Sequence, residues 1–161
     1  MSTVVCNSGP LIALGGIGHL HLLRDLFGIV SVPREVQAEC LAGGSSQTGR
    51  DAILAATWLE IVDFTGPPDP LLTSLLDVGE SRAIELALRL KADVLLMDEA
   101  RGRRVARDIY SLTVVGTGRI LVEAKRARLI STVAPLVEAV RANGYWLSER
   151  IVAEICRQAG E

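Results

Sequence analysis

Short, wholly apolar runs alternate along the chain with longer segments in which apolar residues recur at helical spacing. An apolar run between polar breakers predicts a strand buried on both faces, and recurrence every three to four residues predicts an amphipathic helix. The expected strands cover residues 3–6, 29–32, 58–64, 94–97 and 113–115. The expected helices cover residues 10–26 (interrupted near 15–16), 33–41, 49–57, 79–91, 101–108, 116–128, 131–142 and 148–159.

Strands that alternate with helices predict a parallel sheet covered by helices on both faces. We therefore expect an α/β fold with three layers, α/β/α, around a central parallel sheet of four to five strands. Apolar and acidic residues alternate in 58–64, which places that strand near an edge, and residues 66–70 (GPPDP) are the strongest break in the pattern. The helices after about residue 131 are expected to pack on the same domain or to contribute to a dimer contact.

The composition is that of one globular domain, expected to cover residues 1–161. The formal net charge of −2 gives no overall signal for nucleic acid, so such binding would need a local basic patch. The three cysteines are far apart and form no CxxC pattern, which argues against a disulfide framework or a zinc ribbon. We find no basic signal region and no apolar run of membrane-spanning length, and we expect a cytoplasmic protein without membrane association.

Four polar residues are candidates for one site. If the strands ending at residues 6 and 97 are neighbours, the side chains that follow them meet at the carboxyl edge of the sheet, where ligands bind in open α/β folds. Three carboxylates and one amide oxygen suit Mg²⁺ or Mn²⁺, and such a metal activates water against a phosphodiester. The four residues are Asn7 and Asp98 at strand ends, Glu39 in the helix after the second strand, and Glu80 at the start of helix 79–91.

Each of the four residues also has a purely structural interpretation. Asp77 and Glu80 have the spacing of a capping box, which is compatible with a second role for Glu80. Asp98 could cap the helix that follows it, and Glu39 could be one acid on a solvated helix face. Asn7 could form an Asx turn. Spacing alone leaves these alternatives open.

Four stretches of the chain carry a resemblance to a known family: VVCNSGPLIALGGIGHLHLLRDLFG, VPREVQAE, VGESRAIELALRLKADVLLMDEARGRRVA and VVGTGRILVEAKR. In this order they span nearly the whole sequence, and the first and third are the most specific. The chain resembles the PIN-domain family, small nucleases whose fold is shared with many toxins of bacterial and archaeal toxin–antitoxin pairs. More narrowly, it is similar to a PIN-like subfamily of prokaryotic proteins.

The resemblance implies a PIN-like three-layer fold and a metal-dependent ribonuclease that uses Mg²⁺ or Mn²⁺ in an acidic pocket. Position by position, the second, third and fourth acids of the family pattern fall on Glu39, Glu80 and Asp98, which it makes catalytic residues and metal ligands. The first acid falls on Asn7, where this chain departs from the pattern. Ser8 matches a small hydroxyl residue that often accompanies the first acid.

The asparagine at position 7 changes the expected chemistry. Its carbonyl oxygen can still face a cation, but one negative charge is missing. Two unit charges ~4 Å apart interact by roughly 4 kcal/mol at an effective dielectric of about 20, so weaker metal binding is expected. Three acids remain and Glu99 is adjacent to Asp98. The narrower subfamily is compatible with asparagine at this place.

A basic cluster begins three residues after Asp98 and comprises Arg101, Arg103, Arg104 and Arg107. Guanidinium groups bind phosphates bidentately, so Arg101 and Arg104 are candidates for RNA binding beside the acidic pocket, although solubility is an equally good explanation. Thr117, in a Gly-Thr-Gly turn before a helix, could face the same pocket. Exposed aromatic residues for base stacking are few, so binding is expected to be mostly electrostatic.

Three functions compete. The first is a metal-dependent ribonuclease acting as the toxin of a toxin–antitoxin pair, for which the resemblance implies a small antitoxin partner and a homodimer. The second is a non-catalytic PIN-like module that binds RNA or protein and whose metal site is weakened at Asn7. The third, an unrelated doubly wound hydrolase using Asp98 with Mg²⁺, lacks a DxD motif after the first strand.

Overall fold

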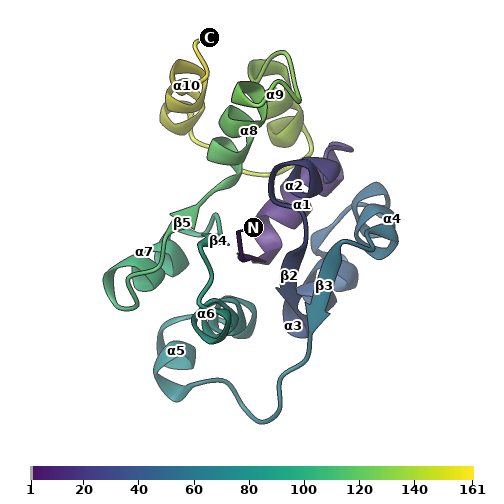
Figure 1. Ribbon diagram of the computed structural model, residues 1–161. Coiled ribbons are helices and arrows are strands. Elements are labelled where there is room, and N and C mark those ends of the chain that lie inside the picture. The colour runs from purple at the N-terminus through teal and green to yellow at the C-terminus, as the bar shows by residue number, and fades with distance from the viewer. Residues whose placement is uncertain (1) are drawn as a thin grey trace.

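A five-stranded parallel sheet forms the centre of the protein, whose computed structural model describes residues 2–161 (Figure 1). The strand order is β3-β2-β1-β4-β5, and every neighbouring pair is parallel. The predicted α/β class and parallel sheet are confirmed. The strands are β1 (Val4–Cys6), β2 (Val30–Pro33), β3 (Leu59–Val62), β4 (Val94–Leu96) and β5 (Val114–Val115).

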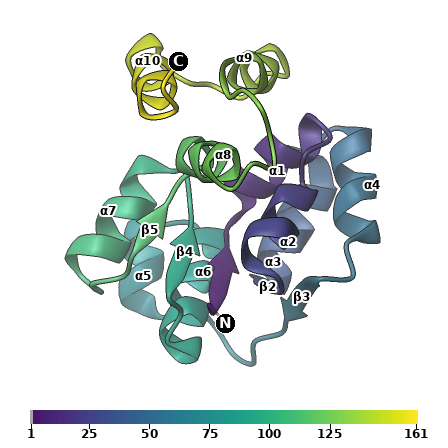
Figure 2. The same cartoon turned by 45° about the horizontal axis from the view of Figure 1, so that its top comes forward.

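Helices connect these strands and cover both faces of the sheet (Figure 2). The helical elements before β4 are α1 (Ser8–Gly16), α2 (His21–Phe27), α3 (Arg34–Glu39), the π-helical turn η1 (Cys40–Gly44), α4 (Gln47–Ala55), α5 (Pro70–Leu75) and α6 (Val78–Leu90). Those after β4 are α7 (Ala100–Asp108), α8 (Thr117–Arg126), α9 (Ala134–Ala142) and α10 (Glu149–Gln158).

The sheet separates two apolar cores because successive strand residues point to opposite faces. In β1, Val4 and Cys6 belong to one core and Val5 to the other. The first core is shared with α1, α2 and α8, and the second with α5, α6 and α7. This arrangement gives the three layers that the sequence pattern predicted.

Some local predictions were wrong. Helix α5 was missed because Pro70 was interpreted only as a breaker, whereas it occupies the first turn of that helix and Asp69 Oδ1 accepts a bond from Leu71 N at 2.8 Å. Pro33 ends β2 and does not begin a helix. Residues 40–44, predicted partly as loop, form the π-helical turn.

The C-terminal helices pack on the domain, α9 against α1 and α10 against α8. Ile155 of α10 is in the first core, and the carboxylate of Glu161 accepts bonds from Lys125 Nζ at 2.8 Å and Val133 N at 2.7 Å. Lys125 therefore has a structural partner. Among residues 2–161, no helix has the length and apolar character needed to cross a membrane.

A buried arginine fixes the position of α6. Arg82 is 5% exposed, and its guanidinium pairs with Glu35 of α3 at 2.8 Å and with Glu85 at 2.9 Å. It also donates to the Gly66 carbonyl oxygen and lies over the ring of Phe64. Because a buried charge without partners is costly, this network locks α6 against α3 and thereby sets where the first turn of α6 lies.

Candidate functional site: the carboxyl edge of β1 and β4

Strands β1 and β4 are neighbours, with Cys6 opposite Leu96, so the residues that follow them share one edge of the sheet. The Asn7 N–H donates to the Leu96 carbonyl oxygen at 2.9 Å, which extends the pairing by one residue. Asn7 and Asp98 therefore lie at the edge where the strand pattern predicted them. The first turns of α1 and α8 and the start of α7 surround this edge (Figure 2).

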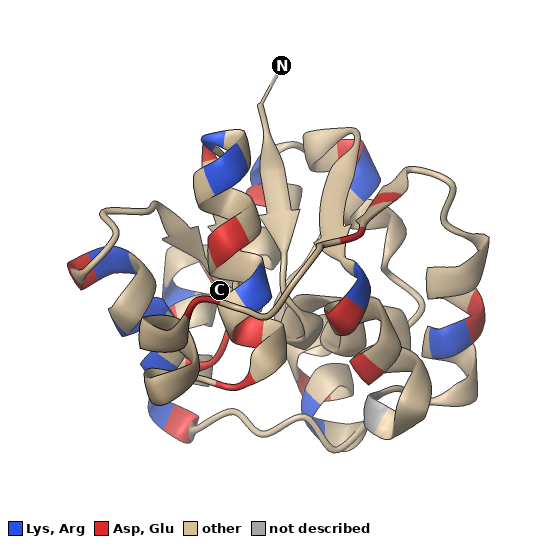
Figure 3. Cartoon of the chain, turned by 90° about the horizontal axis from the view of Figure 1, so that it is seen from below, with Lys and Arg blue, Asp and Glu red and all other residues tan. Residues whose placement is uncertain are grey.

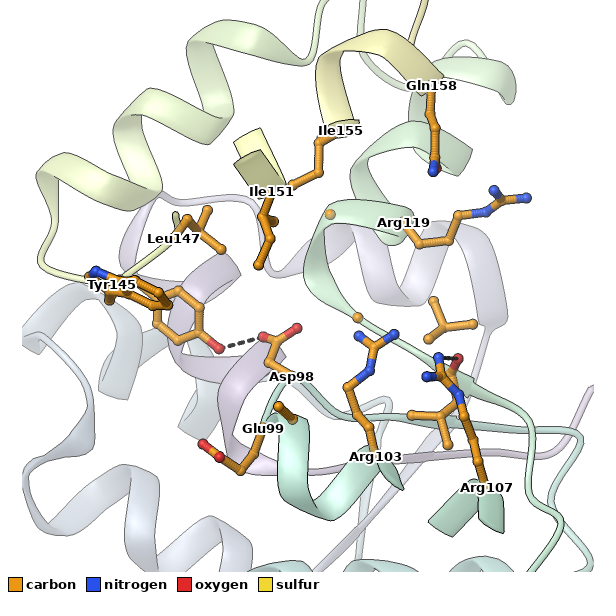
Figure 4. Close-up of a pocket in the computed structure, with 16 residues that line it drawn as sticks. Asp98, Glu99, Arg103, Arg107, Arg119, Tyr145, Leu147, Ile151, Ile155 and Gln158 are labelled. Carbon is orange, nitrogen blue, oxygen red and sulfur yellow. Dashed lines mark hydrogen bonds between the residues drawn. The ribbon is translucent and has the colours of Figure 1, made fainter. Parts of the chain in front are cut away.

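Asp98 is held by three hydrogen bonds. Its Oδ1 accepts from Thr117 N at 2.6 Å, and its Oδ2 accepts from Thr117 Oγ1 at 2.6 Å. Its Oδ2 also accepts from the Tyr145 hydroxyl at 2.5 Å (Figure 4). The carboxylate thus caps α8, favoured by the helix dipole, and does not cap α7 as the structural alternative proposed. Thr117 is buried and faces Asp98.

Tyr145 reaches Asp98 because α1 begins with a small residue. A Cβ placed on Gly9 would lie 2.8 Å from the Tyr145 hydroxyl oxygen and 3.1 Å from Asp98 Oδ2, so any side chain there would push the pair apart. Burial, followed by the charge and hydrogen bond of Asp98, raises the pKa of Tyr145 well above its usual value. The tyrosine therefore stays a neutral donor to the carboxylate.

Asn7 is 4% exposed, and its side-chain Oδ1 has no hydrogen-bond partner among the described residues. The side chain does not cap α1, so the Asx-turn alternative is wrong. A buried amide oxygen without a donor costs free energy, and a cation or a water molecule is what would satisfy it. Asn7 thus presents an unpaired side-chain oxygen at this edge of the sheet.

Glu39 and Glu80 form a second group of acids at the same edge. Glu39, at the end of α3, lies against the first turn of α6, where a Cβ on Gly79 would be 2.7 Å from Glu39 Oε2. Its pKa is raised by burial of one side and by the charge of Asp77, while the Ser8 hydroxyl opposes the shift. Glu39 is exposed to solvent, as the alternative of an acid on a helix face expected, and it also lies against the first turn of α6.

Glu80 completes the predicted capping box with Asp77: its backbone N–H donates to Asp77 Oδ1 at 2.8 Å, and its Oε2 accepts from Asp77 N at 3.3 Å. Burial raises its pKa to about 7, with further contributions from the charges of Asp77, Glu99 and Glu39. Among residues 2–161, no lysine or arginine forms an ion pair with Glu39 or Glu80. Excess negative charge is therefore concentrated beside α6.

The arginines of α7 divide between two surfaces. Arg101 lines a depression of about 310 Å³ together with Asp77, Glu80 and Glu99. Arg103 and Arg107 line a larger cleft of about 860 Å³ next to Asp98 (Figure 4). Arg104 is exposed and lines neither of these two hollows.

The donor set fits a hydrated hard cation better than a closed metal cage. In the part of the chain from residue 2 onward, no three His, Cys, Asp or Glu side chains are grouped closely enough to hold one ion. The unpaired Asn7 oxygen and the acids beside α6, which have no ion-pair partner among residues 2–161, are nevertheless oxygen donors of the kind that such a cation binds. Mg²⁺ commonly binds through one or two carboxylates and keeps several waters, so this chemistry is compatible with the site.

Sequence reasoning missed Tyr145 as a partner of Asp98. The two residues are 47 positions apart, and Tyr145 follows α9 in a segment whose position depends on how the C-terminal helices pack. No local pattern signals such a contact. Asp77 was recognised as a cap but not as a charge that raises the pKa of both Glu39 and Glu80.

A profile of one protein family, described as a PIN domain, matches residues 3–161 of this chain. The match covers almost the entire sequence, including every strand and the residues at the carboxyl edge. No curated protein and no solved structure gives a significant match.

Proposed function

Because the chain belongs to the PIN-domain family, we propose that it is a metal-dependent ribonuclease that cleaves RNA phosphodiesters with the help of Mg²⁺ or Mn²⁺. We further propose that it acts in the cytoplasm as the toxin of a toxin–antitoxin pair, with a small antitoxin protein as partner and a homodimer as its assembly. Residues 1–161 would form a single domain. PIN domains are generally nucleases and typically use divalent metal ions, which supports the class of reaction.

The observation that carries the proposal is the uncompensated acidity beside α6. Glu39 and Glu80 both have raised pKa values, caused first by burial and next by neighbouring carboxylates, and neither has an ion-pair partner among the described residues. The fold therefore keeps like charges together at a cost that a bound cation would relieve. The buried, unpaired Asn7 oxygen lies at the same sheet edge.

Asn7, Glu39, Glu80 and Asp98 would surround the metal, with one or two of the carboxylates binding it directly and the other groups acting through bound water. The metal would supply activation of water and stabilisation of the leaving oxygen. The chain itself would contribute Ser8, which orients Glu39, and Thr117, which holds Asp98 through two bonds. Glu99 and Arg101 would line the side of the pocket where RNA enters.

A specific observation also favours the second candidate, a non-catalytic PIN-like module that binds nucleic acid or protein. The first acid of the family pattern is replaced by Asn7, and Asp98 already accepts three protein hydrogen bonds. Both features reduce the negative charge that is free to hold a metal. Such a module would bind its partner without needing Mn²⁺.

The test is cleavage of a mixed RNA pool by the wild type, Glu80→Gln and Glu60→Gln, with Mn²⁺ or with EDTA. Glu60 is an exposed acid on β3, so Glu60→Gln is a matched control for loss of one negative charge. We expect cleavage only with Mn²⁺, unchanged in Glu60→Gln and at least about tenfold slower in Glu80→Gln. Equal cleavage by all three proteins, or cleavage in EDTA, would contradict the proposal.

Calorimetric titration with Mn²⁺ separates the two candidates. The ribonuclease requires heats of binding in the wild type that are reduced in Asp98→Ala. Absence of binding heat together with absence of cleavage would favour the non-catalytic module. The toxin role is tested by expression in bacteria, where growth arrest by the wild type and growth with Glu80→Gln are expected.

A further inference from the structure

A cleft of about 860 Å³ lies between α7 and α10, next to Asp98, and has two chemically different walls (Figure 4). One wall carries the guanidinium groups of Arg103, Arg107 and Arg119. The other is apolar and consists of Trp146, Leu147, Ile151 and Ile155. A basic wall facing an apolar wall suits a ligand that presents charge on one side and a flat apolar surface on the other.

The two α7 arginines that line the cleft, Arg103 and Arg107, form no ion pair with an acid among the described residues. Arg103 Nη1 lies 3.5 Å from the Met97 carbonyl oxygen, and Arg107 Nη2 lies 3.3 Å from that of Val114. Neither forms an ion pair within residues 2–161, whereas Arg119 pairs with Glu123 at 2.9 Å. Burial, and then the charge of Arg107, lowers the pKa of Arg103, although Asp98 opposes the shift. Two neighbouring guanidinium groups without counter-ions would both gain from an anion.

Trp146 is 78% exposed, an unusual position for the largest apolar side chain. Its backbone is nevertheless held in place, because the preceding Tyr145 donates its N–H to the Val140 carbonyl oxygen at 3.2 Å and its hydroxyl to Asp98. The indole of Trp146 is thus an exposed aromatic surface at the rim of the cleft, and the bonds of Tyr145 hold the backbone next to it. Composition alone had predicted no surface of this kind.

We propose that this cleft binds single-stranded nucleic acid, with Arg103 and Arg107 holding backbone phosphates and Trp146 stacking on a base. The proposal rests on the proposed ribonuclease function and names how its substrate is held. A single strand offers phosphates and uncovered base faces together, whereas a duplex hides its base faces. Lysines, arginines and acids are interspersed over the helices visible in Figure 3, so attraction to a polyanion depends on this local cluster.

The experiment measures binding in EDTA, where a metal-dependent reaction cannot occur. The chain has two tryptophans, so in Trp58→Phe the fluorescence reports on Trp146 alone. Titration with a short single-stranded oligonucleotide is expected to quench this fluorescence in a saturable way. By anisotropy of a labelled oligonucleotide, Trp146→Ala should bind about tenfold more weakly. Because Trp146 is exposed, this variant is expected to fold normally, which far-UV circular dichroism checks.

The phosphate contacts are tested by salt dependence. Arg103→Gln/Arg107→Gln should reduce the slope of log K against log salt by about 1.4, since each phosphate contact to a single strand contributes about 0.7. The matched control is Arg24→Gln/Lys91→Gln, which removes the same charge from exposed positions outside the cleft and should leave the slope unchanged.

Three outcomes would overturn the proposal: unchanged Trp146 fluorescence on oligonucleotide binding, equal affinity of Trp146→Ala, or equal quenching by a polyglutamate peptide, which would indicate a protein ligand. Saturable, Trp146-dependent binding without any Mn²⁺-dependent cleavage would support the proposal while the ribonuclease function fails. Failure of the binding proposal and failure of the ribonuclease function can therefore be told apart.

Discussion

Asp98 and Glu80 are acids at the same edge of the sheet, but the fold treats them differently. Asp98 accepts three hydrogen bonds and sits at the N-terminus of α8, where the helix dipole favours a negative charge. Glu80 belongs to a group of carboxylates without an ion-pair partner among residues 2–161, and its pKa is raised to about 7 by burial and by Asp77. One acid contributes to the stability of the metal-free protein and the other opposes it.

The difference shows which part of the site is structural and which part depends on a cation. Hydrogen bonds from Thr117 and Tyr145 stabilise the negative charge of Asp98, as a bound metal would. Glu39 and Glu80 have no comparable donors, and a cation near them would gain most. Removing Asp98 should therefore lower the stability of the protein, whereas removing the charge of Glu80 should not.

The largest expected effect is that of Asp98→Ala. The substitution leaves the Thr117 N–H and the Tyr145 hydroxyl without their acceptor, and we expect the free energy of unfolding to fall by about 3 kcal/mol. Glu80→Gln keeps a side-chain oxygen for the capping box and removes the repulsion of the ionised carboxylate, so it should raise the free energy of unfolding by up to about 1 kcal/mol above pH 7. Urea denaturation of both variants measures this difference, and equal losses of unfolding free energy would contradict it.

Asn7→Asp restores the missing charge and should act in two directions. Without metal, a nearly buried carboxylate close to other acids should lower the free energy of unfolding by about 1–2 kcal/mol. With Mn²⁺, affinity should rise roughly tenfold, equivalent to ~1.4 kcal/mol and a fraction of the full charge–charge interaction. Calorimetry on Asn7→Asp and on Asn7→Ala measures this, and unchanged affinity in the former would place residue 7 outside the metal site.

Much of the fold follows from local sequence pattern. Most strands are short, largely apolar runs between polar breakers, so their places were predictable, and the capping box at the start of α6 was visible from the spacing of Asp77 and Glu80. The adjacency of β1 and β4, which the sequence pattern left as a condition, brings Asn7 and Asp98 to one edge. These features depend on neighbours within a few residues or on general rules of parallel sheets.

The side-chain partners at the site were less predictable. The contact of Tyr145 with Asp98 depends on the packing of α9 against α1, which no local pattern encodes. Arg101 and Arg104 were expected beside the acidic pocket: Arg101 lies beside Glu80 and Glu99, whereas Arg104 lines neither hollow. Arg103 and Arg107 line the larger cleft instead, because the rotation of α7 decides which arginines face it. Sequence gives the helix and its charges, but packing decides where the charges point.

Tyr145→Phe isolates one of the three bonds to Asp98. A hydrogen bond to a charged group is worth about 1.5 kcal/mol or more, so we expect a loss near that value in urea denaturation. The other tyrosine, Tyr110, has no hydroxyl hydrogen bond within the described residues, and Tyr110→Phe should be nearly neutral. Mn²⁺ affinity should not fall in Tyr145→Phe, since Asp98 is freed; a fall would show that the tyrosine orients Asp98 for metal binding.

The smallest expected effect is the pH dependence caused by Glu80. Its pKa is about 7 in the folded protein against 4.5 in the unfolded chain, so between these values the folded state binds more protons. The contribution of Glu80 to stability is therefore greatest below pH ~4.5, falls as the pH rises towards 7, and levels off above. The side chain is partly exposed to solvent, which screens the repulsion, so we expect a loss of only about 1 kcal/mol.

Adding a cation tests whether this pH-dependent loss of stability comes from Glu80. In Glu80→Gln the decline between pH 4.5 and 7 should be smaller, with the remainder due to Glu39, whose pKa is shifted in the same direction. Mn²⁺ at pH 8 should raise the melting temperature of the wild type, because a bound cation offsets the repulsion that appears when Glu80 ionises. A rise of equal size in Glu80→Gln would mean that the cation binds elsewhere, and the contrast between the two acids would then describe stability alone.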